Sequence, residues 1–128
     1  MKKVVHIKDK DFEHFIDFQD IQESVKRVAQ EIDRDLMGKN PIFLTVLNGA
    51  FMFAGELMKE ISIPCEITFV RLASYQGTTT TERVKEVLGL NESIENRTVV
   101  VVEDIVDSGN TMVALIEQLK KHNPKEVK

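Results

Sequence analysis

The segment VVVVEDIVDSGNT, from Val99 to Thr111, places four consecutive valines directly before a loop with three acidic residues, a glycine and two hydroxyl side chains. An uninterrupted apolar run of this kind is typical of a parallel strand that is covered on both faces of its sheet. The polar residues would then form a loop at the carboxyl end of that strand, which is where open α/β sheets bind ligands. The segment therefore predicts a layered α/β fold with a binding site in this loop.

Other parts of the chain show the alternation of helix and strand patterns that such a fold needs. The predicted elements are a helix over 18–37, a strand over 42–47, a helix over 51–61, strands from 65 to about 73 and over 83–90, the valine strand, and a helix over 111–122. Apolar residues recur at steps of three and four in the first helix and form short continuous runs in the strands. We expect one α/β domain over residues 1–128, with a parallel sheet and helices on both faces.

The two ends of the chain carry weaker patterns. The charged segment KDKDFEH, residues 8–14, is predicted to be a solvated turn. The final residues, NPKEVK, contain a proline followed by Val127, as if a further strand began there. We therefore expect an incomplete sheet and a chain that is truncated or is a fragment of a longer one.

Composition favours small-molecule chemistry in the cytoplasm. The net charge is −4 and the sequence has no basic block, so no electrostatic footprint for nucleic acid is present. Cys65 is the only cysteine, which excludes an internal disulfide and suits a reducing compartment. No apolar run approaches the roughly 20 residues that a membrane helix requires. We expect neither a nucleic acid nor a membrane as a partner.

The loop after the valines has the chemistry of a sugar phosphate site. The turn before the following helix can direct several backbone N–H groups at one point, and Gly109 permits their close approach. The helix adds its positive N-terminal end, and Ser108 and Thr111 add hydroxyl donors, so a phosphate group is the expected occupant. Glu103 and Asp104 would repel a phosphate, but carboxylates bind sugar hydroxyls or a magnesium ion held by them. The combination favours a ribose phosphate.

The loop has three other interpretations. In the simplest, the valines form a buried strand, Asp107 or Ser108 caps the next helix, and the acidic pair is merely solvated. A P-loop or dinucleotide fold would need a glycine-rich motif that the sequence lacks. A receiver-type signalling domain also has an acidic pair beside magnesium, but that pair follows the first strand, whereas Glu103 and Asp104 come late in this chain.

The segment from Val99 to Thr111 resembles the signature of type I phosphoribosyltransferases, which bind 5-phosphoribosyl 1-diphosphate (PRPP). It has four hydrophobic residues, two acidic residues and a loop that ends in threonine. The Glu-Asp order of the acidic pair resembles the hypoxanthine-guanine branch, as do the segments LNGAFMFAGEL and FVRLASYQGTTTTERVKE. The resemblance implies purine salvage, in which the phosphoribosyl group passes from PRPP to hypoxanthine or guanine with the help of Mg²⁺. It also implies a homodimer or homotetramer.

The resemblance assigns roles to the residues of the signature. Glu103 and Asp104 would bind the ribose 2′ and 3′ hydroxyls with magnesium beside them. Asp107 would lie near N7 of the purine as a general base. The 5′-phosphate would be wrapped by the loop residues Asp107, Ser108, Gly109, Asn110 and Thr111.

Two other segments take roles by the same resemblance. Leu47 and Asn48 match the family's cis peptide, with the backbone of Asn48 and Gly49 facing pyrophosphate. Ser74 and Tyr75 match its mobile loop and would close over the pyrophosphate.

The chain departs from the family pattern in two respects. Asn48 and Asn110 stand where lysine is frequent, so two positive charges near the phosphates are absent. The family's purine-holding lysine, stacking aromatic residue, second metal-binding aspartate and pyrophosphate-binding arginine all belong to a segment beyond Lys128. A non-catalytic PRPP-binding or regulatory module of the same fold is therefore the second hypothesis.

Overall fold

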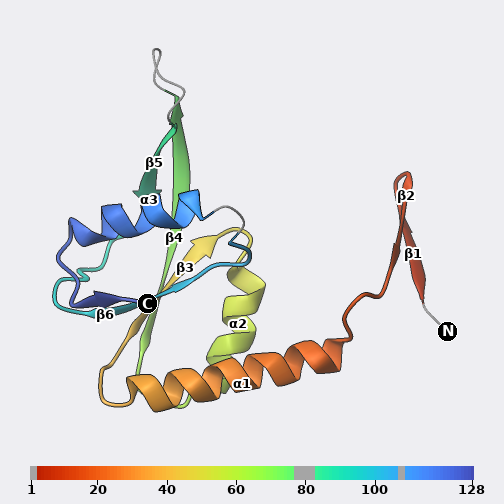
Figure 1. Cartoon of the computed structure of the whole chain (residues 1–128), viewed down its shortest axis with the longest axis horizontal. Coiled ribbons are helices and arrows are strands. Elements are labelled where there is room, and N and C mark those ends of the chain that lie inside the picture. Colours follow the sequence, from red (N-terminus) through yellow and green to blue (C-terminus); the bar gives the residue numbers. More distant parts are fainter. Residues whose placement is uncertain (1–2, 77–82, 107–108) are drawn as a thin grey trace.

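The computed structural model of the chain describes residues 3–76, 83–106 and 109–128 (Figure 1). Its elements, in chain order, are β1 (Val4–Ile7), β2 (Lys10–Glu13), α1 (Phe18–Leu36), β3 (Ile42–Leu47), α2 (Phe51–Glu60), β4 (Glu66–Gln76), β5 (Arg83–Leu88), β6 (Thr98–Val102), α3 (Asn110–Lys120) and β7 (Glu126–Val127). The predicted helices and the central strands are all present, with ends that differ by at most three residues.

A five-stranded sheet with the order β5-β4-β3-β6-β7 forms the centre of the fold. β3 pairs in parallel with β4 on one side and with β6 on the other, and β6 pairs in parallel with β7. The predicted α/β fold with a parallel sheet is therefore confirmed. Because β3, β4 and β6 run in the same direction, the segments that follow their carboxyl ends meet at one edge of the sheet.

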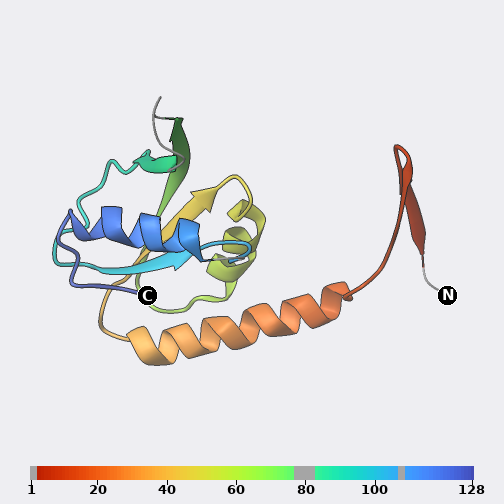
Figure 2. The same cartoon turned by 45° about the horizontal axis from the view of Figure 1, so that its top comes forward.

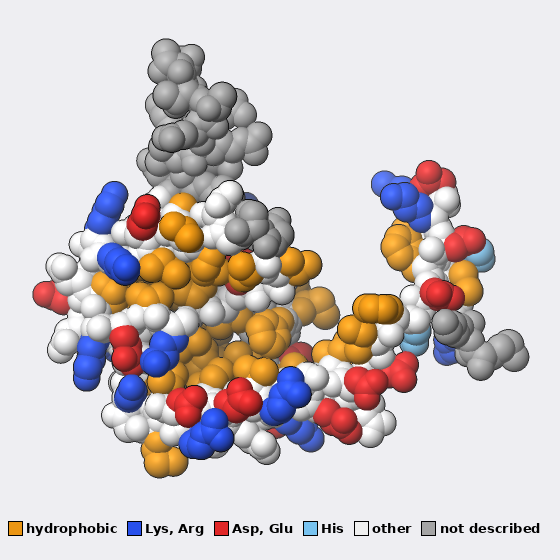
Figure 3. Space-filling view, in the orientation of Figure 1, with side chains coloured by type: hydrophobic (Ala, Val, Ile, Leu, Met, Phe, Trp, Pro, Cys, Tyr) orange, Lys and Arg blue, Asp and Glu red, His pale blue; other side chains and the backbone are white. Residues whose placement is uncertain are grey.

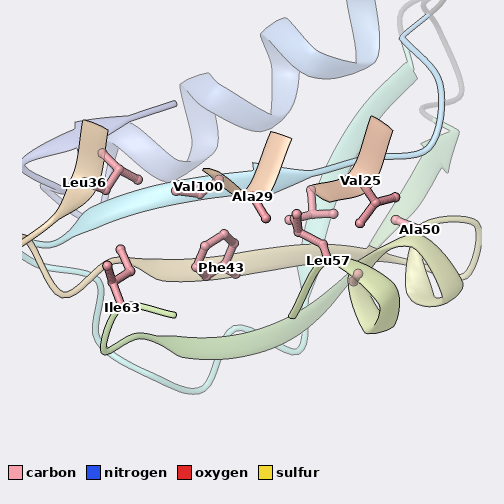
Figure 4. Close-up of a cluster of buried hydrophobic side chains, with 10 residues drawn as sticks. Val25, Ala29, Leu36, Phe43, Ala50, Leu57, Ile63 and Val100 are labelled. Atoms are coloured by element: carbon pink, nitrogen blue, oxygen red, sulfur yellow. The ribbon is translucent and has the colours of Figure 1, made fainter. Parts of the chain in front are cut away.

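Two clusters of buried apolar side chains lie on the two faces of this sheet. The cluster under α1 and α2 contains Val25, Ala29, Leu36, Phe43, Ala50, Ala54, Leu57, Ile63, Val100 and Val102 (Figure 4). The cluster under α3 contains Ile42, Leu44, Val46, Val70, Ile94, Val99, Leu115 and Leu119. Since Val100 and Val102 point to one cluster and Val99 to the other, the valine strand is buried on both faces, as its composition predicts.

Helix α1 separates its apolar and charged residues by face. Val25, Ala29 and Leu36 are buried against the sheet. Figure 3 shows acidic and basic side chains along the outer side of this helix. None of the helices in the described ranges has the length and apolar character that crossing a membrane requires.

The strand β4 extends further than its sequence pattern predicts. The predicted strand ends near Ala73, where polar residues begin, but β4 continues to Gln76. Over this stretch it pairs with β5 in antiparallel register, from Arg71 opposite Leu88 to Gln76 opposite Arg83. Backbone hydrogen bonds to a neighbouring strand do not depend on apolar side chains, so the hairpin continues through the polar segment.

The solvated turn predicted over 8–14 is confirmed only in part: the segment is exposed and turns at residues 8–9, but Lys10–Glu13 is a strand. β1 and β2 form an antiparallel hairpin, with Val4 opposite Glu13 and Ile7 opposite Lys10. Lys8, at a φ of 56°, lies in the turn between them. Figures 1 and 2 show this hairpin projecting away from the main sheet beyond the start of α1. The β-branched residues of β1 favour extended backbone, and the charged side chains of the segment do not prevent strand pairing.

The last residues begin a strand, as the sequence predicts. β7 pairs with β6 through Glu126 opposite Thr98 and Val127 opposite Val99. The Lys128 backbone N–H donates to the Val99 carbonyl at 2.8 Å, and the Val101 N–H donates to the Lys128 carbonyl at 2.9 Å.

We expect Phe43→Ala to lower the free energy of unfolding by about 3–5 kcal/mol, because it leaves a cavity at the centre of the cluster under α1 and α2. Phe43 is fully buried, whereas Phe15 is 94% exposed. The matched control Phe15→Ala should change stability by less than about 0.5 kcal/mol. Urea denaturation of both variants measures the difference, and equal losses would contradict this description of the core.

Candidate functional site

The loop after β6 and the start of α3 enclose a pocket of about 140 Å³ at the carboxyl edge of the sheet. Its lining residues are Glu103, Asp104, Ile105, Val106, Gly109, Thr111 and Met112. All of them come from the segment that the sequence singles out or from the first turn of the helix that follows it. The acidic pair and the N-terminus of α3 therefore face the same small space.

Gly109 gives the turn before α3 its shape. This residue has a φ of 83° and directly precedes the helix. Glycine adopts this left-handed conformation without the steric penalty that a side chain would bring. The interpretation in which Asp107 or Ser108 is the N-cap does not hold, because Gly109 occupies that position. Asp107 and Ser108 themselves lie outside the described residues.

The start of α3 offers donors to an anion. The first backbone N–H groups of a helix have no acceptor within the helix, and the helix dipole places partial positive charge there. Gly109, Thr111 and Met112 bring this helix end to the pocket. Such an end suits a phosphate group.

The acidic pair is held by short-range hydrogen bonds. The Asp104 backbone N–H donates to Glu103 Oε1 at 3.0 Å, and the Ile105 N–H donates to Asp104 Oδ1 at 2.8 Å. A hydrogen bond with the Glu103 carboxyl group and the one from Ile105 lower the pKa of Asp104 below its ordinary value. Asp104 therefore carries a negative charge at neutral pH and can accept hydrogen bonds from sugar hydroxyls.

Gly49 brings a second loop against the acidic pair. It follows β3, and the peptide bond between Leu47 and Asn48 is cis, as the resemblance implies. A Cβ atom at Gly49 would overlap Asp104 Oδ2 and lie 2.8 Å from Asp104 Cγ. Glycine permits this approach without displacing the Asp104 carboxyl group, so the loops after β3 and β6 meet at this residue.

Arg71, which the sequence analysis did not single out, contacts the loop after β3. Its Nη2 donates to Asn48 Oδ1 at 2.9 Å. Arg71 lies opposite Leu47 in the register of β3 and β4, next to the start of the first loop. Only the pairing of β3 with β4 identifies Arg71 as a neighbour of this loop, and the pattern of apolar residues in a strand does not predict that pairing.

The remaining predicted residues are distributed as follows. Asn110 is the first residue of α3, directly after Gly109. Ser74 and Tyr75 lie on β4, where they pair with Lys85 and Val84 of β5. The threonine run lies in 77–82, outside the described residues.

The carboxylates of Glu103 and Asp104 suit a magnesium ion that is also held by substrate oxygens and water. In the parts of the chain that the structure describes, no three acidic, histidine or cysteine side chains gather into a cage for a metal ion. Mg²⁺ is commonly held by one or two carboxylates together with substrate oxygens and water. Glu103 and Asp104, both facing the pocket, supply that number of carboxylates.

We expect Gly49→Ala to displace the Asp104 carboxyl group, because the new Cβ would overlap it. The carboxyl group can rotate away, so the change in stability should be below about 1 kcal/mol. The ¹³C carboxyl resonance of Asp104 and urea denaturation measure the two effects. The matched control is Gly55→Ala, whose Cβ meets nothing within 4 Å. An Asp104 resonance that shifts equally in both variants, or in neither, would contradict the contact.

Known proteins are similar to this chain in sequence and in fold. The family described as phosphoribosyl transferase domain matches residues 16–128. The hypoxanthine-guanine phosphoribosyltransferase of Streptococcus thermophilus is 36% identical over 111 residues, which are 86% of this chain and 62% of that protein. The hypoxanthine-guanine-xanthine phosphoribosyltransferase of Tritrichomonas foetus is 36% identical over 109 residues, 85% of this chain and 60% of that protein.

Solved structures agree with the sequence relatives. A crystal structure of a hypoxanthine-guanine phosphoribosyltransferase from Bacillus anthracis has a TM-score of 0.75 at 34% identity and covers 89% of this chain and 65% of that chain. The chain spans less than two thirds of the length of the two curated relatives. The match over residues 16–128 and the shared fold establish that this chain belongs to the phosphoribosyltransferase family.

Proposed function

We propose that this protein transfers the phosphoribosyl group of PRPP to hypoxanthine or guanine, giving the nucleoside 5′-monophosphate and pyrophosphate. The observation that carries the proposal is the shared pocket of the acidic pair and the α3 N-terminus, which fits a ribose that bears a phosphate. The names of the relatives support a purine as the acceptor. We also propose that the protein acts in the cytoplasm as a homodimer or homotetramer.

The parts of PRPP bind to different residues around the pocket. The 5′-phosphate occupies the turn of residues 107–111, where it accepts hydrogen bonds from backbone N–H groups at the start of α3. Glu103 and Asp104 accept hydrogen bonds from the ribose 2′ and 3′ hydroxyls. The loop of Asn48 and Gly49 faces the pyrophosphate group.

In the chemical step, a purine ring nitrogen attacks C1 of the ribose as the bond from C1 to pyrophosphate breaks. Positive charge develops on the ribose ring, and the carboxylates of Glu103 and Asp104 stabilise it. Asp107 accepts the proton that the purine loses. Mg²⁺, when bound, offsets the negative charge of the leaving group. Ser74 and Tyr75 close over the site and exclude water, which would otherwise hydrolyse PRPP.

A second candidate function is binding of PRPP without transfer. The composition of the pocket favours it, because no aromatic side chain that could stack on a purine is among the described lining residues. Incubation of the full-length protein with PRPP and hypoxanthine or guanine distinguishes the two functions. Release of pyrophosphate with formation of the nucleotide supports transfer, whereas tight PRPP binding without product supports the binding module.

We expect Glu103→Ala and Asp104→Ala each to weaken magnesium-dependent binding of PRPP by about tenfold or more, because each removes a charged acceptor for a ribose hydroxyl. Isothermal titration calorimetry with PRPP and Mg²⁺ measures the effect. Glu117→Ala is the matched control, since Glu117 is an exposed carboxylate of α3 outside the pocket lining. Unchanged affinity in both site variants would remove the acidic pair from ribose binding.

We expect Asp107→Asn to lower turnover by about tenfold or more while leaving PRPP affinity nearly unchanged. The amide cannot take the purine proton, but the backbone around the 5′-phosphate is the same. Steady-state kinetics with hypoxanthine, together with calorimetry for PRPP, separate the two quantities. A variant with the turnover of the parent protein would show that Asp107 is not the base.

A further inference from the structure

We propose that Arg71, oriented by Asn48, is the cation that binds the pyrophosphate group of PRPP in this protein. The inference rests on the proposed function, because it assigns one residue to one part of that ligand. It concerns Arg71 as a ligand-binding residue and Asn48 as its positioning residue.

Arg71 carries a positive charge that no described carboxylate neutralises. Its guanidinium group donates to the Asn48 side-chain oxygen, which is a neutral acceptor. Two other arginines contact carboxylates: Arg34 contacts Asp35 and Arg97 contacts Glu66. Among the carboxylates whose side chains the structure describes, none pairs with Arg71, so its positive charge remains available to an anionic ligand.

Arg71 is connected to the acidic pair through the loop after β3. β4, β3 and β6 are neighbours in the sheet. At their carboxyl edge, Arg71 of β4 contacts Asn48, and the next residue, Gly49, lies against Asp104 after β6. The residues therefore form a continuous row, with a cation at one end, carboxylates at the other and the first loop between them.

A ligand that carries both sugar hydroxyls and a diphosphate fits this row of residues. Carboxylates accept hydrogen bonds from sugar hydroxyls, whereas a guanidinium group binds phosphate oxygens through its planar set of N–H donors. A ribose that carries a diphosphate presents both groups on one molecule. Arg71 would therefore distinguish PRPP from ribose 5-phosphate, which has no diphosphate.

The role of Asn48 follows from its contact with Arg71. An exposed arginine side chain such as that of Arg71 has many rotamers, and fixing it costs conformational entropy. The hydrogen bond from Nη2 to Asn48 Oδ1 orients the guanidinium group beside the first loop before any ligand binds. A lysine at position 48 would instead carry its own charge into the same loop.

The test is calorimetry on the full-length protein with Mg²⁺ and three ligands: PRPP, inorganic pyrophosphate and ribose 5-phosphate. We expect Arg71→Gln to weaken binding of PRPP and pyrophosphate about tenfold, since a charge-assisted hydrogen bond to phosphate is lost. The affinity for ribose 5-phosphate should not change. Arg71→Lys, which keeps the charge without the planar donor set, should lose less affinity than Arg71→Gln.

A matched control and a rescue variant complete the experiment. Arg97→Gln removes a guanidinium group that donates to the Asn40 carbonyl at 3.0 Å and pairs with Glu66, next to the amino ends of β3, β4 and β6. This control should leave all three affinities unchanged. Asn48→Lys in the Arg71→Gln background should restore part of the pyrophosphate affinity, because it returns a positive charge to the first loop.

The outcomes separate this inference from the proposed function. If the parent protein binds PRPP and Arg71→Gln binds PRPP and pyrophosphate equally well, the assignment of Arg71 is overturned and the proposed function stands. Weaker binding of ribose 5-phosphate to the same degree would also overturn it, because Arg71 would then act on the whole site. A parent protein that neither binds PRPP nor forms product overturns the proposed function, and this inference with it.

Discussion

The parallel pairing of β3 with β4 and β6 is the interaction on which the site depends. Ile42 lies opposite both Glu66 and Val99, so the three strands begin nearly level. This register brings the loop after β3 between Arg71 and Asp104, although these three parts of the chain are far apart in sequence. Without this register, the row of charged groups at the carboxyl edge would not exist.

The two clusters of apolar side chains make that register rigid. β3 and β6 contribute side chains to both clusters, with Phe43 and Val100 on one face and Ile42 and Val99 on the other. A shift of one residue in either strand would turn every side chain to the wrong face. The acidic pair follows β6 directly, so the core that fixes the strand also fixes where the two carboxylates begin.

The sequence predicts those parts of the molecule that are contiguous in the chain. The strand of valines, the acidic loop and the helix after it are neighbours in sequence, so periodicity and loop chemistry identify them together. The contact of Gly49 with Asp104 and the hydrogen bond of Arg71 with Asn48 depend on strand order and register. The local pattern of apolar and polar residues predicts neither the strand order nor the register. The N-terminal hairpin was missed because charged residues obscure its strand pattern.

The close approach of Gly49 to Asp104 links the two positions energetically. A larger side chain at position 49 needs the space that the Asp104 carboxyl group occupies, so substitutions at the two positions will not have additive effects. Each loop thus limits the sequences that the other can accept. Sequence changes in the loop after β3 are therefore constrained by the loop after β6, although the two loops are far apart in sequence.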